Sequence, residues 1–341
     1  MRARDEACVG VDLSGSNVRA AVVDAAGHVL GQERHRLLSK EPPQVAEAVV
    51  RAAKTACGAA GLPFGEVRAL GVGVAGQVEK GNGMVASAPA LGWKDVPLQK
   101  LLQARASKLP MTLAGDLAAA AWAERTAGAG KGADDLLVVL IGSTVGAGMV
   151  ISGKLHEGAS GAAGELAHVK VHPNGRICAC GQRGCLEAYA SAPSLAAWAR
   201  DDLRIAAAAA RASGKQPGLG RRLLDHAGGD PERITAAAME RAAHEGDELS
   251  SRLLDEAARL LGQAVANLVI ALNPERLLLG GGLLSGSPRM RRTIVEAVEQ
   301  NLSRAARAAL QIGAPALEDD AAVIGAALIA REALRPDPPH A

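Results

Sequence analysis

The chain has 341 residues, 48% of them hydrophobic, which is enough for two domains that each have a core. Its 38 basic and 36 acidic residues leave a formal charge of only +2, without a run of Lys and Arg suited to nucleic acid or an anionic membrane. No apolar stretch has the length of a membrane span, and the first residues lack a signal-peptide pattern, so we expect a cytoplasmic protein.

The predicted elements begin with three strands joined by short turns in residues 9–30. This segment, VGVDLSGSNVRAAVVDAAGHVL, bounds β-branched runs with Gly and Ser. The pattern returns in residues 136–155, LLVVLIGSTVGAGMVISGKL, where Gly142 aligns with Gly15 of the first copy. We interpret the repeat as a duplicated α/β domain whose two hairpin turns face each other across a cleft.

The two hairpin turns have the composition of a phosphate site. Their glycines let backbone amides approach a phosphate chain, and the hydroxyl groups of Ser16, Ser143 and Thr144 are donors to phosphate oxygens. Two such turns predict a clamp for a triphosphate. The alternative is a pair of ordinary tight turns, because Gly and Ser are common in turns.

Ala-rich segments between and after the hairpins have helical periodicity, which gives an α/β class overall. One apparent dinucleotide motif, GVGVAG at residues 71–76, leads into a polar turn and another strand instead of a helix, so we exclude an NAD site. A Walker-type phosphate loop is also missing from the sequence. The predicted helices cover residues 43–60, 116–128, 192–212, 234–245 and 247–272.

The stretch HVKVHPNGRICACGQRGCLE contains three of the five cysteines, Cys178, Cys180 and Cys185, behind His168. One imidazole and three thiolates form a ligand set that structural zinc prefers, and four protein ligands leave no position for a reactive water. We therefore predict a zinc ion that holds a loop in shape. His172 is the rival nitrogen ligand, and spacing alone does not choose between the two histidines. The alternative to a metal site is a set of reduced cysteines that have a histidine nearby by chance.

Two carboxylates, Glu165 and Glu187, flank the cysteine stretch. Carboxylates and an imidazole held in place suit the vicinal hydroxyl groups of a polyol, because they accept or donate hydrogen bonds with little rotamer entropy left to lose. The alternative is a pair of solvated surface glutamates.

At these residues the sequence resembles the ROK family of repressors, open reading frames and kinases, with bacterial glucokinases nearest. GELAHVKVHPNGRICACGQRGCLEAYAS is similar to the family signature, E-x-G-H followed by C-x-C-G-x-x-G-C-x-E. DLSGSNVR resembles the first phosphate motif, IGSTVGAGM the second, and NPERLLLGGGLL the adenosine motif. The resemblance runs from about residue 8 to about residue 333. It implies a duplicated actin-like ATPase fold (ribonuclease H-like) with two lobes around a cleft, and transfer of the γ-phosphate of ATP to a sugar hydroxyl, usually the 6-hydroxyl of a hexose.

The resemblance also implies roles for individual residues. Asp116 would be the general base; the alternative, which the sequence alone supports nearly as well, is that Asp116 only caps the start of a helix. Asp12 would orient Mg²⁺ or its water, and Glu165, His168 and Glu187 would bind sugar hydroxyl groups, with the second ring nitrogen of His168 on the Zn²⁺ ion. The residues implied to contact ATP are Gly15, Ser16, Gly142, Ser143 and Thr144 at the phosphates and Gly280, Gly281 and Gly282 at the adenosine, the last three being a plain strand-to-helix turn in the alternative interpretation.

For the domains we expect a small lobe over residues 1–113, a large lobe over 114–318, a C-terminal helix over 319–333 that returns to the small lobe, and a disordered tail over 334–341. The expected partners are a sugar and ATP. The resemblance allows a homodimer, for which no heptad or aromatic patch argues independently. The repressors of the family carry a helix-turn-helix ahead of the first phosphate motif. Here that motif begins at residue 12, so we expect no DNA-binding repressor.

Two departures from the family pattern favour a second hypothesis. Gly115 and Ala90 stand where the family usually has Asn, which removes two polar groups that would hold sugar hydroxyls. At roughly 1 kcal/mol for each hydrogen bond, the loss would weaken sugar binding by about ten- to thirtyfold. The alternative to a hexose kinase is therefore a catalytically weak sugar-binding or regulatory protein.

Overall fold

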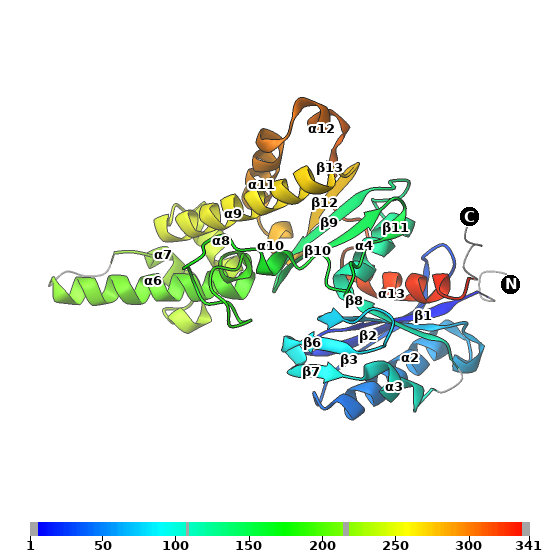
Figure 1. Cartoon of the computed structure of the whole chain (residues 1–341). Helices are drawn as coiled ribbons and strands as arrows, with labels where there is room; N and C mark the ends of the chain where they lie inside the picture. Colours follow the sequence, from blue (N-terminus) through cyan, green and yellow to red (C-terminus); the bar gives the residue numbers. More distant parts are fainter. Residues whose placement is uncertain (1–5, 107–108, 214–217, 336–341) are drawn as a thin grey trace. The chain divides into compact units, whose positions relative to one another are not determined.

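The computed structural model describes residues 6–106, 109–213 and 218–335, so most of the tail over 334–341 lies outside the described residues. Strands alternate with helices, which confirms the α/β class (Figure 1). Within the described part of the chain, none of the helices combines the length and apolarity needed to cross a membrane. Contacts divide the chain into two compact units, residues 1–138, 147–164 and 313–341 in the first and 139–146 with 165–312 in the second. The lobe boundaries expected at residues 113 and 318 stay a prediction.

The first sheet has five strands in the order β3-β2-β1-β4-β8. The antiparallel part follows from the short turns between β1 and β2 and between β2 and β3, whereas β1, β4 and β8 run parallel. The carboxyl ends of the parallel strands therefore meet at one edge, as in other open α/β sheets. The strands are β1 (Cys8–Leu13), β2 (Asn17–Val23), β3 (Val29–Arg36), β4 (Leu70–Val74) and β8 (Met111–Gly115).

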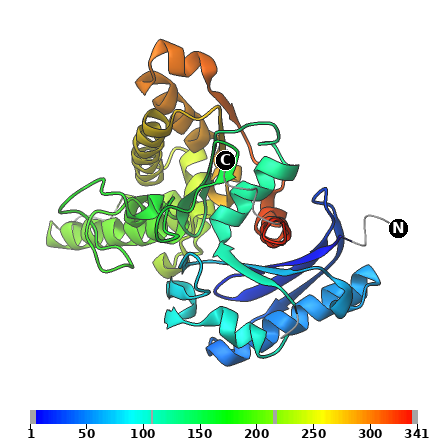
Figure 2. The ribbon, with the colours of Figure 1, turned by 45° about the vertical axis from the view of Figure 1, so that its right-hand side comes forward.

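Helices cover both faces of this sheet (Figure 2). Helix α2 (Pro42–Ala60) packs on β2 and β3, while α13 (Ala321–Glu332) packs on β1 and β4 and against α4 (Asp116–Ala127). The approach of α13 and α4 is so close that a Cβ atom on Gly325 would lie 1.7 Å from the carbonyl oxygen of Ala119. Glycine is required there, because any side chain would collide with backbone.

The remaining elements before residue 110 form a small antiparallel sheet, β5-β6-β7, with short helices beside it. β5 directly follows β4, so GVGVAG does lead into a strand and not into a helix. These elements are η1 (Phe64–Glu66), β5 (Gln77–Val78), β6 (Val85–Ala88), η2 (Pro89–Leu91), β7 (Trp93–Val96) and α3 (Leu98–Gln103).

The second five-stranded sheet has the order β11-β10-β9-β12-β13. This order matches the first sheet position by position: three consecutive strands lie side by side, and two later strands follow on the far side of the first of them. The predicted duplication is confirmed at the level of topology. The strands are β9 (Leu136–Ile141), β10 (Val145–Ile151), β11 (Lys154–Leu155), β12 (Arg276–Gly280) and β13 (Gln311–Gly313).

The helices of the second unit begin at side chains that cap their free amides. Ser191, Thr235 and Asp247 accept hydrogen bonds from Ser194, Ala238 and Ser250, and so start α6, α8 and α9. All five predicted helices are confirmed, with ends shifted by at most two residues. The remaining elements are η3 (Leu166–His168), α5 (Glu187–Ala190), α6 (Ala192–Ala212), α7 (Arg221–His226), η4 (Pro231–Arg233), α8 (Ala236–His244), α9 (Glu248–Leu272), α10 (Gly282–Ser285), α11 (Pro288–Asn301), α12 (Arg304–Ala309) and η5 (Glu318–Asp320).

Candidate functional site

The cysteine stretch folds into a loop that gathers four donor atoms. One ligand atom from each of His168, Cys178, Cys180 and Cys185 lies within 4.8 Å of all the others. Cys178 and Cys185 are buried, whereas Cys180 is exposed. The loop turns tightly at Gly184, whose φ is 74° and where a Cβ atom would lie 1.7 Å from the carbonyl oxygen of His172. The predicted ligand set is thus brought together by the fold.

The residues of this cluster fit a zinc ion. Nδ1 of His168 is buried and has no hydrogen-bond partner among the described residues, as expected of a nitrogen aimed at a metal. Burial raises the pKa of the Cys178 thiol to about 12, so a cation is needed to hold that sulfur as a thiolate near neutral pH. Lys170 Nζ, 3.0 Å from Cys185 Sγ, is one such positive charge beside the cluster.

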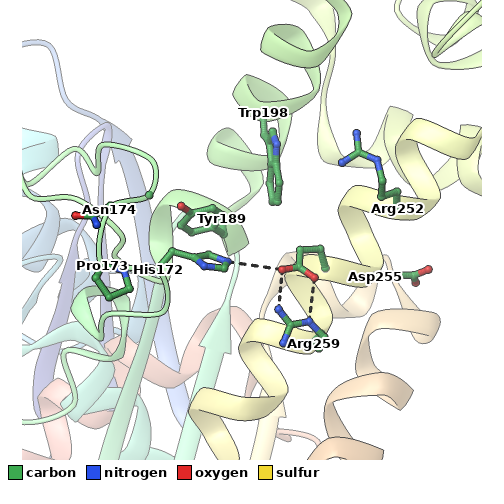
Figure 3. A pocket seen from close by; sticks show the side chains of 10 residues that line it. His172, Pro173, Asn174, Tyr189, Trp198, Arg252, Asp255 and Arg259 are labelled. Carbon is green, nitrogen blue, oxygen red and sulfur yellow. Dashed lines mark hydrogen bonds and ion pairs between the residues drawn. The ribbon is translucent and has the colours of Figure 1, made fainter.

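The rival ligand His172 lies in a different environment. Its Nε2 atom is 3.7 Å from Oε1 of Glu256, and its ring centroid is 5.0 Å from that of Tyr189 (Figure 3). Glu256 in turn accepts two hydrogen bonds from Arg259, at 2.9 and 2.7 Å. His172 therefore lines a cavity of about 1030 Å³ between the loop and α9, and the structure brings His168 to the sulfurs instead.

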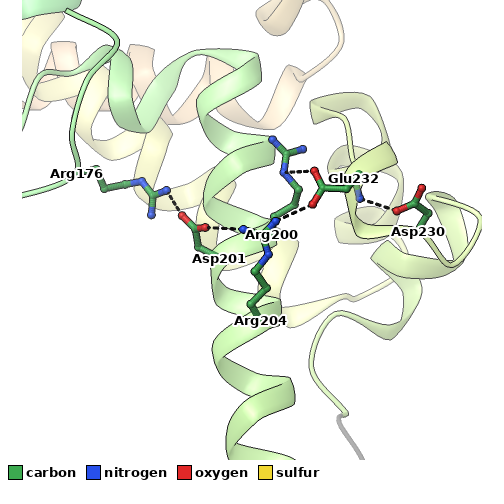
Figure 4. Close-up of polar contacts among 6 residues, drawn as sticks. All are labelled: Arg176, Arg200, Asp201, Arg204, Asp230 and Glu232. Carbon is green, nitrogen blue, oxygen red and sulfur yellow. Dashed lines mark hydrogen bonds and ion pairs between the residues drawn. The ribbon is translucent and has the colours of Figure 1, made fainter. Parts of the chain in front are cut away.

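Polar contacts anchor the cysteine loop to α6. Arg176 pairs with Asp201, which also contacts Arg204 at 3.5 Å, and Arg204 reaches Glu232 at 2.7 Å (Figure 4). These partly exposed ion pairs contribute little each, typically about 0–1 kcal/mol. The buried anchor is Tyr189, whose hydroxyl oxygen accepts a 2.6 Å hydrogen bond from the Arg176 amide.

The three residues predicted to bind sugar hydroxyls, Glu165, His168 and Glu187, lie together beside the loop. His168 Nε2 is 3.7 Å from Glu165, so the ring offers its two nitrogens in two directions. Burial raises the pKa of Glu187, against the opposing effects of a 3.3 Å hydrogen bond from the Val145 amide and of the nearby His168. Two carboxylates and an imidazole that share one location are suited to several hydroxyl groups of one ligand.

The second hairpin turn and the glycines after β12 adjoin each other. Gly281 has φ 95° and packs on the end of β9, where a Cβ atom would lie 2.4 Å from the carbonyl oxygen of Ile141. A Cβ on Gly142 would be 3.8 Å from the Gly282 amide nitrogen. Gly280 is buried at the end of β12, and Thr144 is exposed in the turn between β9 and β10.

A cavity of about 480 Å³ opens over these glycines. Gly142, Ser143 and Gly282 line it, as expected for a nucleotide site, and so do residues 235–237 and 240–241 at the start of α8. The sequence analysis missed α8 as part of this site. The only available signal was its N-cap Thr235 and helical periodicity, which indicate a helix without indicating what the helix faces.

In the first unit, Asp12 lines a small cavity of about 150 Å³ together with Ser14, Asn17 and two arginines. Burial raises the pKa of Asp12 to about 6, although Arg19 and Arg34 act to lower it. The arginines lie on the same sheet face as Asp12, because Asp12 pairs with Arg19 and Arg19 pairs with Arg34 across the strands. The carboxyl group of Asp12 therefore changes from its neutral to its ionised form at about pH 6.

The other predicted residues of the first unit lie at neighbouring turns. Ser16 accepts a 2.7 Å hydrogen bond from the side chain of Asn17, and a Cβ atom on Gly15 would lie 2.6 Å from Cβ of Ala90. Asp116 is the first residue of α4, and Gly115 occupies the N-cap position. Asp12 lies in β1 and Asp116 directly follows β8, and these two strands are two strand spacings, about 10 Å, apart.

Comparisons with known proteins agree with this arrangement. The ROK family model matches residues 8–333. The chain is 32% identical to a glucokinase of Streptomyces coelicolor over 97% of this chain and 98% of the relative. It is 31% identical to a ROK family glucokinase from Streptomyces griseus, solved in complex with glucose and AMPPNP, with a TM-score of 0.75 over 96% of this chain and 99% of that one. A xylose repressor from Caldicellulosiruptor bescii is 28% identical, over 93% of this chain and 76% of the repressor. The structural likeness confirms the predicted duplicated actin-like fold class.

Proposed function

Because the chain belongs to the ROK family, we propose that it transfers the γ-phosphoryl group of ATP to a hexose or N-acetylhexosamine, with the 6-hydroxyl group as acceptor. A duplicated actin-like fold alone does not imply this activity, because folds host many functions. The proposed activity therefore rests on the chemistry of the residues that line the sites.

One contact carries the proposal: the Val145 amide donates a hydrogen bond to Glu187 Oε2 at 3.3 Å. Val145 closes the turn that contains Gly142 and Ser143, and Glu187 belongs to the carboxylate and imidazole cluster. A turn suited to phosphate and a cluster suited to hydroxyl groups are therefore directly joined within the second unit. This is the arrangement that phosphoryl transfer to a polyol requires, because the reaction depends mainly on positioning and electrostatics.

In this proposal Asp116 is the general base. A carboxylate accepts the proton of the sugar hydroxyl as its oxygen attacks the phosphorus, and such a base contributes typically about 10²–10⁴-fold to the rate. Asp116 accepts a 2.9 Å hydrogen bond from the Leu117 amide on one of its two oxygens. That bond orients the carboxylate at the first turn of α4.

Three segments of the chain would contact the nucleotide and its metal ion. Asp12, at the end of β1, would orient Mg²⁺, whose preference is for carboxylate and water oxygens. The amides of the turns at Gly15 and Gly142 and the hydroxyls of Ser16, Ser143 and Thr144 would contact phosphate oxygens. Gly280, Gly281 and Gly282 would contribute backbone without side chains to the adenosine.

The zinc ion would be held by His168 through Nδ1 and by the thiolates of Cys178, Cys180 and Cys185. With four protein ligands it would supply structure and no catalytic water. Its effect on the proposed reaction would be to fix the ring of His168, and so to present Nε2 beside Glu165 to the sugar.

The proposal is tested by supplying the purified protein with Mg-ATP and a panel of sugars, and measuring ADP by a coupled assay. The panel is glucose, mannose, fructose, N-acetylglucosamine and N-acetylmannosamine. We expect sugar-dependent ADP formation with at least one of them. ADP at the background rate with every sugar would refute the kinase assignment.

A second candidate is a sugar-binding regulatory protein with little turnover. Gly115 and Ala90 favour it, since neither offers a side-chain polar group next to Asp116 and Gly15, respectively. The same panel distinguishes the two functions. Thermal stabilisation by a sugar without ADP formation would favour the regulatory protein, whereas stabilisation accompanied by turnover favours the kinase.

A further inference from the structure

Glu240 is a carboxylate in the wall of the 480 Å³ cavity that no motif had marked. It lies one helical turn after Ala236 in α8, and both residues line the cavity. The Gly142–Ser143 turn and Gly282 line the same cavity. The cavity therefore combines the backbone and hydroxyl donors of the turn with one acceptor, Glu240, and one cation, Arg241, from α8.

One oxygen of this carboxylate lacks a partner. Oε1 of Glu240 is buried and accepts no hydrogen bond from the described residues. The carboxylate as a whole does have a donor, because the Ser287 side chain hydrogen-bonds to it, and Ser287 is itself fully buried as the N-cap of α11. Buried oxygens without a donor are rare in folded proteins, so an unpartnered oxygen on a residue that lines a cavity indicates a missing hydrogen-bond donor.

The charge of Glu240 limits which part of a nucleotide can supply that donor. A phosphate group would be repelled by the carboxylate, and phosphate-binding groups are found instead at the Gly142–Ser143 turn. The nucleoside carries neutral donors, namely the exocyclic amine of adenine and the ribose hydroxyl groups. Because Ser287 already hydrogen-bonds to the Glu240 carboxylate, Oε1 is left for one donor of the nucleoside.

We propose that Glu240 is a specificity-determining residue that accepts a hydrogen bond from the nucleoside of the bound nucleotide through Oε1. This inference rests on the proposed function, because it assumes that the cavity holds the nucleoside part of ATP. It also assigns to α8 the part of the adenosine site that the glycine run after β12 does not supply.

The test measures ADP binding in the presence of Mg²⁺ by calorimetry for the wild type, Glu240→Ala and Glu240→Gln. Removing a hydrogen bond to a charged group is expected to weaken ADP binding by about ten- to a hundredfold in Glu240→Ala. Glu240→Gln keeps an acceptor oxygen and should lose about three- to tenfold. The control Glu296→Ala removes the same charge from an exposed position of α11 and should bind ADP like the wild type.

Tripolyphosphate separates a nucleoside contact from a general defect. It reaches only the phosphate turns, so Glu240→Ala should bind it at least as tightly as the wild type does. A parallel loss of tripolyphosphate and ADP affinity would mean that Glu240 acts through the fold, and would overturn the inference. So would tighter ADP binding by Glu240→Ala, which would show that the carboxylate only repels anions.

Two ADP analogues identify the donor. Purine riboside diphosphate lacks the exocyclic amine, and 2′-deoxy-ADP lacks a ribose hydroxyl group. The analogue that lacks the donor should bind the wild type as weakly as ADP binds Glu240→Ala, and should show no further loss with that variant. Additive losses for both analogues would overturn the inference. A wild type that binds neither ADP nor ATP would refute the proposed function itself, whereas equal ADP binding by the wild type and Glu240→Ala would refute only the role of Glu240.

Discussion

Substituting one thiol of the cysteine loop tests whether a metal holds that loop. Cys178 is only 4% exposed, and burial raises the pKa of its thiol to about 12. Removing a proton from a thiol of that pKa at pH 7 costs about 7 kcal/mol. Structural zinc binds peptide ligand sets with an apparent free energy of about 10–16 kcal/mol at pH 7, so a zinc ion is expected to overcome the cost. The metal-free loop would keep the Cys178 thiol protonated and would leave Nδ1 of His168 without a partner among the described residues.

We therefore expect the wild type to contain one zinc per chain by elemental analysis and Cys178→Ser to contain less than a tenth of that amount. The matched control is Cys57→Ser, which alters an equally buried thiol in α2 and should retain the full metal content. A chelator should lower the melting temperature of the wild type and of Cys57→Ser but not that of Cys178→Ser. Binding should also weaken as the pH falls, because the thiolates compete with protons. Metal-free wild type, or full zinc content in Cys178→Ser, would refute the reasoning.

Three other predictions follow from individual carboxylates. Asp116→Asn should lower kcat by about 10²–10⁴-fold while sugar affinity by calorimetry stays within about threefold; a loss of both would give Asp116 a structural role. Glu124 is fully buried and accepts hydrogen bonds from the amides of Ala129, Ala316 and Leu317, so Glu124→Ala should reduce the free energy of unfolding by about 3–5 kcal/mol in urea titrations, against no change for the exposed Glu47→Ala. The pKa of Asp12 is raised from 3.8 to about 6, so the carboxyl group lowers the stability of the fold progressively as the pH rises from about 4 to about 6, and the loss is complete above pH 6. Asp12→Asn should then be more stable than the wild type by about 2–3 kcal/mol at pH 8 and equal to it near pH 4, whereas Mg²⁺-dependent turnover of the wild type should fall below pH 6; parallel stability curves would contradict this.

The parts of the fold that the sequence predicted are those whose cause is local. The hairpins around Gly15 and Gly142 need only β-branched runs and small turn residues, and the five predicted helices carry their own caps and apolar periodicity. Helix α11, by contrast, has three buried residues among many charged ones, and its apolar face becomes evident only when it packs on α9. The sequence analysis did not include it among the helices.

The cysteine loop was predictable for a different reason. Its four donors lie within 18 consecutive residues, so their meeting requires only a tight loop. The choice between His168 and His172 was beyond the sequence, because it depends on α9. Oε1 of Glu256 in that helix lies 3.7 Å from Nε2 of His172, so His172 contacts α9 and not the sulfur atoms.

The glycines after β12 show why a motif can indicate a fold and a ligand site at the same time. Gly281 must be glycine whether or not a nucleotide binds, since its φ is 95° and a side chain would collide with the backbone of Ile141. At Gly282 a Cβ atom would meet nothing within 4 Å in the described part of the chain, so the fold alone does not require glycine there. Of the three glycines Gly280, Gly281 and Gly282, only Gly282 lines the 480 Å³ cavity. The run therefore combines a residue fixed by packing with one whose missing side chain leaves room in the cavity, and only the second bears on nucleotide binding.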